Sequence, residues 1–434
     1  MYFVLAMLSF IIFCMWKKYD YVYLLYIISI IAIPSNSYIE NKMGVDIYFD
    51  VRDIMAIFML VIIIMNKKNF FSINIPQLLF YSVAFLIFLI SVAIGIVNDN
   101  RFLNYEIQLY PLLIIKICAF IGWIKTFKIG MSILIHGFVL SSLCYSIFTI
   151  LLYFFGQNIL NDIYGSFYGD IWNSSGRVGF KNTTVLLIIN LFSIYMIYTQ
   201  KRIVLNFVNI ILGSTSILIS QTRSIIILYL LILLVLFVSF IIKSALSNLN
   251  SRTYLIFSIA SFTIPFAFII GFIVFNTDTL LIDSVKSRMF ESNGGSLDSR
   301  MYTNQYNIGM IENNIIGDGL GKEMYFLGSN SQLISIDTWI DNLFIYILVK
   351  FGLIGLCLFI LIVMIGLFKY IKEALIKKNV LTFIILIAYV PFIIITTFMT
   401  SQLLHSQQVY ITFAFLYFIC CKEKYFENIN KKVV

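Results

Sequence analysis

Residues that build catalytic sites in soluble enzymes are scarce in this chain. Charged residues make up 12% of its 434 residues, whereas an ordinary soluble domain has roughly 25%. The histidines, His136 and His405, stand apart from each other and from the 6 cysteines, and no CxxC or Cys/His spacing occurs. We therefore predict no metal site and interpret the cysteines as small packing residues. No Walker A sequence is present, so we expect neither an ATP site nor a cofactor.

Apolar sequence is what the chain has in abundance. Hydrophobic residues make up 61% of it and the mean hydropathy is +0.95, more than one soluble core of ~250–300 residues could bury. Because only helices satisfy their own backbone in lipid over such long runs, we predict an all-α, polytopic integral membrane protein. It would form a single domain over residues 1–434, with about 12–13 transmembrane helices of the length that a ~30 Å hydrocarbon layer requires. The candidate spans are 2–16, 21–34, 54–65, 77–97, 106–124, 129–155, 183–198, 203–219, 224–242, 253–275, 342–368, 380–399 and 406–421.

Lysine and arginine predict how these spans are oriented. Every second connection is basic, from Lys17–Lys18 to the tail after Lys422, while the acidic residues gather in the other connections. The positive-inside rule then places the basic connections and the C-terminus in the cytoplasm and the N-terminus outside. The lysines follow the first apolar run, the reverse of a signal peptide, so we expect a retained first span. This topology accounts for the net charge of +9, and no basic domain points to nucleic acid.

Three connections on the predicted outer side are longer than turns: 35–52, 156–182 and 276–340. Long loops of this kind are usually functional, so we expect the large outer loop 276–340 to bind substrate and to carry catalysis. Within it, "SLDSRMYTNQYNIGMIENNIIGDGLG" predicts an amphipathic helix lying on the outer membrane surface. Ser296 or Asp298 would cap this helix, and Gly317 would end it.

Aromatic residues of this loop are candidates for stacking on sugar rings. Tyr302, Tyr306 and Met310 share one face of the predicted helix, and Trp339 and Tyr325 lie further along the loop. Aromatic residues are also common at membrane interfaces for no other reason than anchoring.

Arginines on the predicted outer side are candidates for binding a phosphate-bearing lipid. Arg177 stands in "GRVGFKN" and Arg223 in "SQTRS", each at the edge of a span. A guanidinium at that depth can hold a phosphate with paired hydrogen bonds, although arginines also snorkel to ordinary phospholipid. Arg300 lies in the first turn of the predicted helix, where the helix dipole opposes a cation, so it is there either for function or for a salt bridge.

Two lysines lie inside predicted spans. Lys116 in "PLLIIKICAF" and Lys350 in "IYILVKFGLIG" would each cost about 2.5–3.5 kcal/mol on insertion at a helix centre. Substrate contact is one explanation, with Lys116 the stronger candidate. Snorkelling or an inward structural hydrogen bond is the other.

Four short motifs follow one another on the outer side between residues 170 and 360. They are "RVGFKN" before a span, "TRS" opening another, "SR" with a helix and "IIGDGLG" in the large loop, and "DNLFIYILVKFGLIGL" entering the next span. In this order they resemble the O-antigen polymerase and O-antigen ligase family of bacterial envelope glycosyltransferases. The resemblance implies that glycan is transferred from undecaprenyl pyrophosphate at the outer face of the cytoplasmic membrane, without nucleotide sugar or metal.

The resemblance also implies a role for the arginines on the predicted outer side. Arg177 and Arg223 would neutralise the leaving pyrophosphate, with Arg300 as a third candidate. Asn182 and Asn342, which stand in two of the motifs, are candidate ligands of sugar hydroxyls. Asp341 is the candidate general base, although a helix N-cap is an equally good explanation for it.

A histidine separates the two branches of this family. The resembling ligases carry one in the large outer loop, close before the Asn that opens the next span, whereas this loop has Asp337 and Asp341 there. We therefore favour a polymerase that joins lipid-linked repeat units, of O-antigen, capsule or another exopolysaccharide.

Other functions stay open at this point. They are an O-antigen ligase, a flippase or other transporter, for which internal repeats and midplane polar residues would be typical, and a purely structural membrane partner. The expected partners are the undecaprenyl-pyrophosphate-linked oligosaccharide and membrane lipid, with a chain-length regulator and a flippase as candidates.

Overall fold

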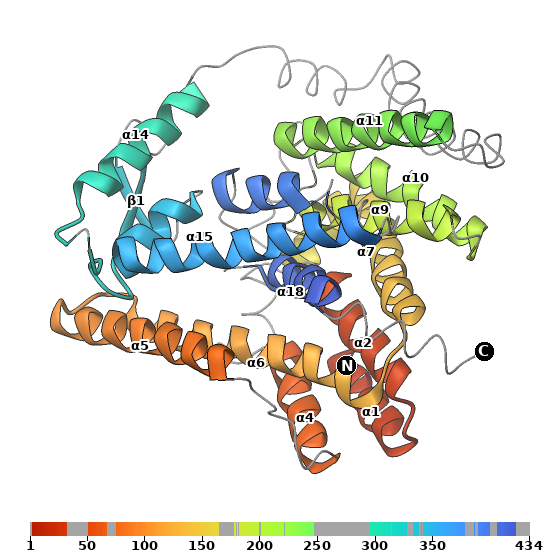
Figure 1. Cartoon of the computed structure of the whole chain (residues 1–434), viewed down its shortest axis with the longest axis horizontal. Coiled ribbons are helices and arrows are strands. Elements are labelled where there is room, and N and C mark those ends of the chain that lie inside the picture. The colour runs from red at the N-terminus through yellow and green to blue at the C-terminus, as the bar shows by residue number, and fades with distance from the viewer. Residues whose placement is uncertain are drawn as a thin grey trace.

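The computed structural model describes residues 2–32, 51–66, 75–164, 178, 180, 182–198, 201–220, 222–246, 295–313, 315–327, 333–337, 340, 342–377, 386, 389–399 and 406–421. Over these residues the chain is an all-α polytopic membrane protein with one small β-hairpin (Figure 1). The described helices Leu103–Phe127, Met131–Phe155 and Leu343–Lys369 are long and apolar enough to cross a membrane, and shorter apolar helices accompany them.

The helices coincide with the predicted spans. In chain order they are α1 (Tyr2–Met15), α2 (Tyr19–Ile31), α4 (Val51–Asn66), α5 (Ile75–Val97), α6 (Leu103–Phe127), α7 (Met131–Tyr164), α9 (Thr183–Tyr198), α10 (Ile203–Ile219), α11 (Arg223–Leu246), α14 (Gly295–Gly309), α15 (Leu343–Lys377), the π-helix η2 (Ile395–Met399) and α18 (Gln407–Cys421). The predicted span 253–275 lies outside the described residues. Apolar run length was enough to find the helices, because a helix is the one structure that such a run can form in lipid.

Aromatic rings fill the centre of the bundle. Phe415 of α18 stacks on Phe138 of α7 with ring centroids 4.6 Å apart, and Phe120 of α6 and Phe192 of α9 meet it edge to face at 6.2 Å and 5.7 Å. All are buried. Edge-to-face and offset contacts are favoured by the ring quadrupole, so this cluster fixes how α6, α7, α9 and α18 pack.

Polar side chains join helices inside the bundle. Asn190 of α9 donates to the Tyr229 hydroxyl of α11 at 3.0 Å, and Ser214 of α10 lies 2.9 Å from the same hydroxyl. Asn209 donates to the Ser193 hydroxyl at 2.9 Å. In lipid such interhelical hydrogen bonds take the place of a hydrophobic driving force.

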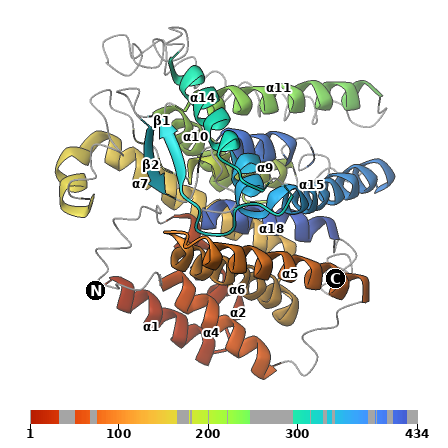
Figure 2. The same ribbon diagram turned by 90° about the vertical axis from the view of Figure 1, so that its left-hand side faces the viewer.

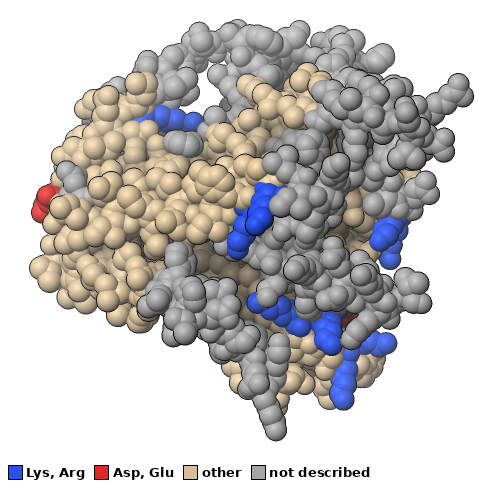
Figure 3. Space-filling model, in the orientation of Figure 1, with Lys and Arg blue, Asp and Glu red and all other residues tan. Residues whose placement is uncertain are grey.

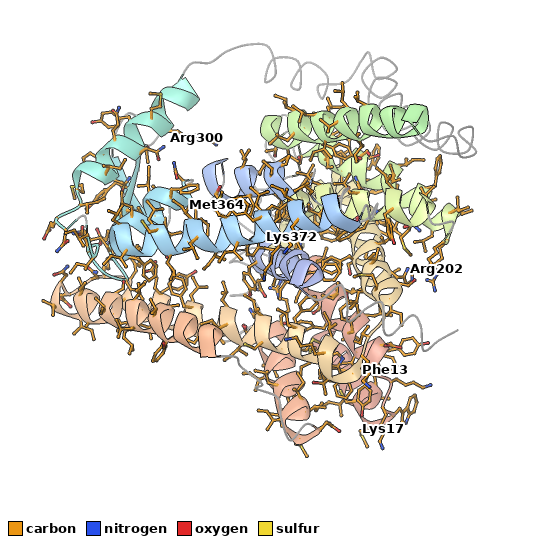
Figure 4. All side chains as sticks on the ribbon, in the orientation of Figure 1. Phe13, Lys17, Arg202, Arg300, Met364 and Lys372 are labelled. Atoms are coloured by element: carbon orange, nitrogen blue, oxygen red, sulfur yellow. The ribbon has the colours of Figure 1, made fainter. Side chains whose placement is uncertain are left out.

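Three basic connections lie at one end of the bundle, which we call the basic end: Lys17–Lys18, Lys125–Lys128 and Lys201–Arg202. The ring of Tyr19, just after Lys17–Lys18, stacks on Phe127, just before Lys128, with centroids 3.7 Å apart. Arg202, in the α9–α10 connection, contacts the His136 ring near the start of α7 at 3.2 Å. Figure 4 shows Lys17 and Arg202 on the right-hand side and Arg300 of α14 on the left.

The opposite end, which we call the loop end, carries the small outer module. Strands β1 (Met324–Leu327) and β2 (Leu333–Asp337) form an antiparallel hairpin that pairs Tyr325 with Ser335, and α14 packs against β1. Figure 2 looks onto this end and shows α14 beside the hairpin. The hairpin was not predicted from the sequence, because its strands are too short to show alternation clearly.

Three helix boundaries differ from the sequence prediction. α14 begins at Gly295, just before the predicted cap residues Ser296 and Asp298, and it ends at Gly309, not at Gly317, since residues 311–313 and 315–321 are non-helical. α7 continues past Gly156 to Tyr164. The predicted span 342–368 is not one continuous helix: Gly352 has φ 64° and ψ −167°, so α15 consists of two helical pieces that meet there.

Candidate functional site

The backbone brings together the chain segments next to Arg177 and Arg223. Arg177 itself lies outside the described residues, and of Arg223 only the backbone, at the first residue of α11, is described. The N–H of Val178 donates to the carbonyl of Ile219, at 3.3 Å. Val178 directly follows Arg177, and Ile219 ends the helix just before Arg223, so this bond joins chain neighbours of the two predicted phosphate-binding residues at the end of α10.

Asn182, which follows Arg177 in the chain, anchors the start of α9 to α2. Its side chain is fully buried and donates from Nδ2 to the carbonyl of Ile31, the last residue of α2, at 2.7 Å. The next residue, Thr183, shares a 2.8 Å hydrogen bond with the Tyr145 hydroxyl of α7. Asn182 therefore joins three helices at the point where the segment carrying Arg177 enters α9.

The aromatic residues predicted to bind sugar lie on α14 and β1. Tyr306 meets Tyr325 edge to face with centroids 5.5 Å apart, whereas Tyr302 is 50% exposed. Asn307 fixes this arrangement, because its amide donates to the Tyr325 carbonyl at 2.8 Å and accepts from the Tyr325 N–H at 3.0 Å. Arg300 is exposed on the same helix (Figure 4).

The phenol of Tyr325 stays protonated at neutral pH. Burial, and after it the charge of the neighbouring Glu323, raises the pKa of this phenol, and its hydroxyl donates to the Glu323 carboxylate at 3.4 Å. A neutral tyrosine offers a hydrogen-bond donor and a ring face, which suits a sugar better than a phenolate would.

Asn342 caps α15. Its Oδ1 accepts from the N–H groups of Phe344 at 3.0 Å and Ile345 at 3.4 Å, the geometry of a helix N-cap. This is the role that the sequence allowed for Asp341. Asp341 and Trp339 both lie outside the described residues, so their predicted roles rest on the sequence.

Lys116 has protein partners inside the bundle. Its ammonium lies 2.5 Å from the Asp53 carboxylate of α4 and donates to the Gln407 amide oxygen of α18 at 2.8 Å. Lys116 is 5% exposed and Asp53 is 2% exposed. Lys116, which was predicted as a substrate ligand, thus links α4, α6 and α18. We call the Lys116–Asp53 ion pair the strut.

Sequence reasoning missed a second buried ionic cluster, at the loop end. Glu106 at the start of α6 and Lys350 in the first piece of α15 are both fully buried, with the ammonium 3.3 Å from the carboxylate. The hydroxyl of Tyr346 donates to Glu106 at 2.7 Å, and Tyr110 lies 2.5 Å from that hydroxyl. The Tyr346 hydroxyl uses its hydrogen in the bond to the Glu106 carboxylate. The Tyr110 hydroxyl is therefore the donor in the bond between the two tyrosines.

The cluster also holds the backbone of the turn "GDGLGK". Glu106 accepts from the N–H of Gly321 at 2.5 Å, and Lys350 donates to the carbonyl of Lys322. Asp318 folds the turn from within, since its carboxylate accepts from the N–H groups of Glu312 at 3.0 Å and Asn313 at 3.2 Å. The available sequence signal was an acid and a base inside two spans, Glu106 and Lys350, of which only the lysine was considered.

Glycines let this turn approach the helices closely. Gly319 has φ +88°, and a Cβ there would collide with the backbone of Gly95 in α5. Gly352, where α15 breaks, faces Gly317, and a Cβ on Gly317 would come within 2.6 Å of the Gly352 nitrogen. Only a residue without a side chain fits such a left-handed, backbone-to-backbone contact.

The described residues contain no group of three His, Cys, Asp or Glu side chains that could hold a metal ion.

The fold and these groups define a polytopic membrane protein with polar, arginine-bearing elements at one end of its helices. A family model described as O-antigen ligase matches residues 208–360, the part that runs from α10 through α11, α14 and the hairpin into α15. Over these residues the chain is similar to the O-antigen ligase family, and the match supports the resemblance to O-antigen polymerases and ligases that the motifs indicated. No curated protein and no solved structure matches the chain.

Proposed function

We propose that this protein polymerises a surface polysaccharide at the outer face of the bacterial cytoplasmic membrane. The single observation that carries the proposal is the O-antigen ligase family match over 208–360, which includes Arg223, Arg300 and the turn "GDGLG". The family covers both ligases and polymerases. The absence of a histidine before Asn342, where Asp337 and Asp341 stand instead, favours the polymerase branch.

The reaction joins two lipid-linked glycans. A hydroxyl at the non-reducing end of a fresh repeat unit attacks the anomeric carbon of the growing chain. The bond from that carbon to the pyrophosphate oxygen breaks, and undecaprenyl pyrophosphate leaves with the electron pair. No ATP is needed, because the pyrophosphate linkage already activates the donor. The hydroxyl proton passes to a base, for which Asp341 is the candidate.

Positive charge at the leaving pyrophosphate is the main catalytic contribution that we assign to the chain. Arg177 and Arg223 take this role, and the Val178–Ile219 hydrogen bond supports it by holding their neighbours together. Groups placed where charge develops usually give the largest catalytic effect. Tyr302, Tyr306 and Trp339 would stack on the sugars, Asn182 and Asn342 stay candidate ligands of hydroxyls, and Lys116 becomes a weaker one because it is paired inside.

The distribution of charge supports the predicted orientation. Most of the lysine and arginine visible in Figure 3 lies on the right, the side of the basic end, whereas an acidic side chain stands out on the left edge. We propose that the basic end faces the cytoplasm and the loop end faces outward, with the N-terminus outside and the C-terminus inside.

The exposed face of α14 supports its predicted position on the membrane surface. Met301, Tyr302 and Ile308 are exposed at 55%, 50% and 45%, while the polar residues Thr303 and Asn307 are buried against the protein. A helix in water would show the opposite pattern. Exposed apolar residues on a helix that also exposes Arg300 and Gln305 suit a helix that lies in the lipid headgroup region, next to the lipid-linked substrate.

A surface-glycan gel tests the function. Cells that lack the protein are complemented with wild type or with Arg223→Ala at matched membrane levels. The proposal expects the ladder of chain lengths to disappear from the Arg223→Ala cells, while a single repeat unit remains on the surface carrier. Loss of the single unit as well in cells without the protein would favour the ligase or flippase instead.

Arg223→Lys sharpens the test of mechanism. If the guanidinium holds the pyrophosphate through paired hydrogen bonds, the retained charge of lysine does not rescue polymerisation. The expected rate loss is about 10²–10³-fold, the range for removing a donor to developing charge. A normal ladder with Arg223→Lys would exclude this role.

A further inference from the structure

We propose that Glu106 and Lys350 form a latch that positions the outer module on the membrane helices; the outer module is the turn 315–322 together with strands β1 and β2. The polymerase reaction enters this inference only through the candidate residues of that module. The latch itself is inferred from contacts, burial and charge.

The latch holds both chain segments from which the outer module leaves the helices. On the side that enters the module, Glu106 accepts from the Gly321 N–H at 2.5 Å, and Lys350 donates to the Lys322 carbonyl. On the side that returns, Glu106 accepts from Tyr346 at 2.7 Å and pairs with Lys350 at 3.3 Å. One buried carboxylate thus fixes the two ends of the module relative to α6.

Backbone hydrogen bonds close the base of the module around this pair. The N–H of Asp318 donates to the Val349 carbonyl at 2.7 Å, and the N–H of Ile354 donates to the Ile315 carbonyl at 3.3 Å. Leu320 donates to the Ser91 carbonyl of α5 at 3.0 Å, and the Ser91 hydroxyl donates to the Lys350 carbonyl at 2.7 Å. The charged pair and these bonds join the turn, α5 and α15 into one unit.

This arrangement does more than satisfy a buried charge. The Glu106 carboxylate and the Lys350 ammonium are both 0% exposed and could have paired only with each other. Instead, each also forms a hydrogen bond with the backbone of the turn. Apolar residues of similar volume often stabilise a fold as well as a buried ion pair does. What the ion pair adds is therefore the fixed position of the turn relative to α15, the helix that Asn342 caps.

Hydrogen exchange of the purified full-length protein, without substrate, tests the latch. The double variant Glu106→Gln, Lys350→Met removes both charges and leaves no buried charge unpaired. We expect the amides of Asp318, Leu320 and Tyr325 to exchange about tenfold faster or more, because the module then opens locally. None of these amides donates to Glu106, so their exchange reports on the module and not on the substituted bond.

The strut provides the matched control. The double variant Asp53→Asn, Lys116→Met removes a buried ion pair of the same chemistry, which joins α4 and α6 and not the module. We expect this variant to leave the exchange of the three amides at the wild-type level. Equal effects of the two double variants, or no effect of the first, would overturn the latch.

A single substitution keeps the test available if the first double variant does not accumulate in membranes. Tyr346→Phe removes the hydroxyl that lies between Tyr110 and Glu106, and it should speed exchange at the same amides by a smaller factor. Unchanged exchange with Tyr346→Phe would also overturn the latch.

A turnover assay on lipid-linked repeat units separates the latch from the proposed function. The latch acting as a positioning device predicts that kcat falls about tenfold or more with KM little changed, since misplacing a reacting group costs rate. If the wild-type protein lengthens no glycan while the exchange result holds, the proposed function fails and the latch stands. If the wild type polymerises and the double variant keeps both its kcat and wild-type exchange, the latch alone fails.

Discussion

Lys116 and Lys350 gave the same signal in the sequence and have different surroundings in the structure. Each is a lysine inside an apolar span, and each is buried and paired with a carboxylate, Asp53 or Glu106. The strut connects side chains of three helices. The latch connects side chains to the backbone of a turn that leads out of the bundle. The role of a charge inside a membrane helix therefore depends on whether its ion pair connects that helix to other helices or to the backbone of a loop.

Replacing the carboxylate of each pair by alanine should give the largest difference in stability between the latch and the strut. Glu106→Ala leaves Lys350 unpaired and removes the acceptor of Tyr346 and Gly321, so we expect a loss of roughly 3–5 kcal/mol. Asp53→Ala leaves Lys116 with the Gln407 amide, so its cost should lie at the lower end, about 3 kcal/mol. Thermal unfolding of both variants in detergent measures this order. A larger loss of unfolding free energy for Asp53→Ala than for Glu106→Ala would contradict the view that Glu106 supports more contacts than Asp53 does.

A substitution at Gly319 can strain the turn beside the latch and leave the Glu106–Lys350 ion pair in place. Gly319→Ala places a Cβ against the Gly95 backbone at φ +88°, and we expect a loss of about 1–3 kcal/mol. Gly309→Ala is the control, since a Cβ there meets nothing within 4 Å and should stabilise the end of α14 by about 0.5–1 kcal/mol. Unfolding curves of the two variants that moved in the same direction would show that the close approach is tolerated.

The contact between α14 and the hairpin should matter less than the latch. Asn307→Ala removes the amide that bonds the N–H and the carbonyl of Tyr325, and we expect a cost of about 1–3 kcal/mol confined to the outer module. Faster proteolysis or hydrogen exchange in 324–327, with the strut region unchanged, is the measurement. Slower exchange there, or a change spread over the whole bundle, would contradict a local role.

The smallest effect is expected on the surface. Arg101 pairs with Glu323 at 3.3 Å but is 69% exposed, so Arg101→Ala should cost less than about 1 kcal/mol, and salt should reduce the wild-type contribution further. A loss as large as that of Glu106→Ala would mean that exposed and buried ion pairs at the loop end act alike. Melting temperatures at low and high salt decide this.

The helices and their order follow from the sequence. Apolar runs found every described helix that crosses the bundle, because lipid leaves the backbone no alternative to a helix, and the cap residues predicted a helix start within a few residues of Gly295, where α14 begins. Three of the four motifs that indicated the family lie in the part that the family model matches. Positions of Arg223, Asn182 and Asn342 at helix starts also followed from where the apolar runs begin.

The contacts at the loop end depend on tertiary packing and could not be predicted from the sequence. Glu106 and Lys350 are 244 positions apart in the numbering of this chain, and no local pattern links them. The break of α15 at Gly352 and the end of α14 at Gly309 depend on contacts with Gly317 and Asp318. A local sequence pattern reports which backbone conformation is favourable within a few turns, whereas the pairing of a buried charge depends on which distant segment reaches it when the helices pack.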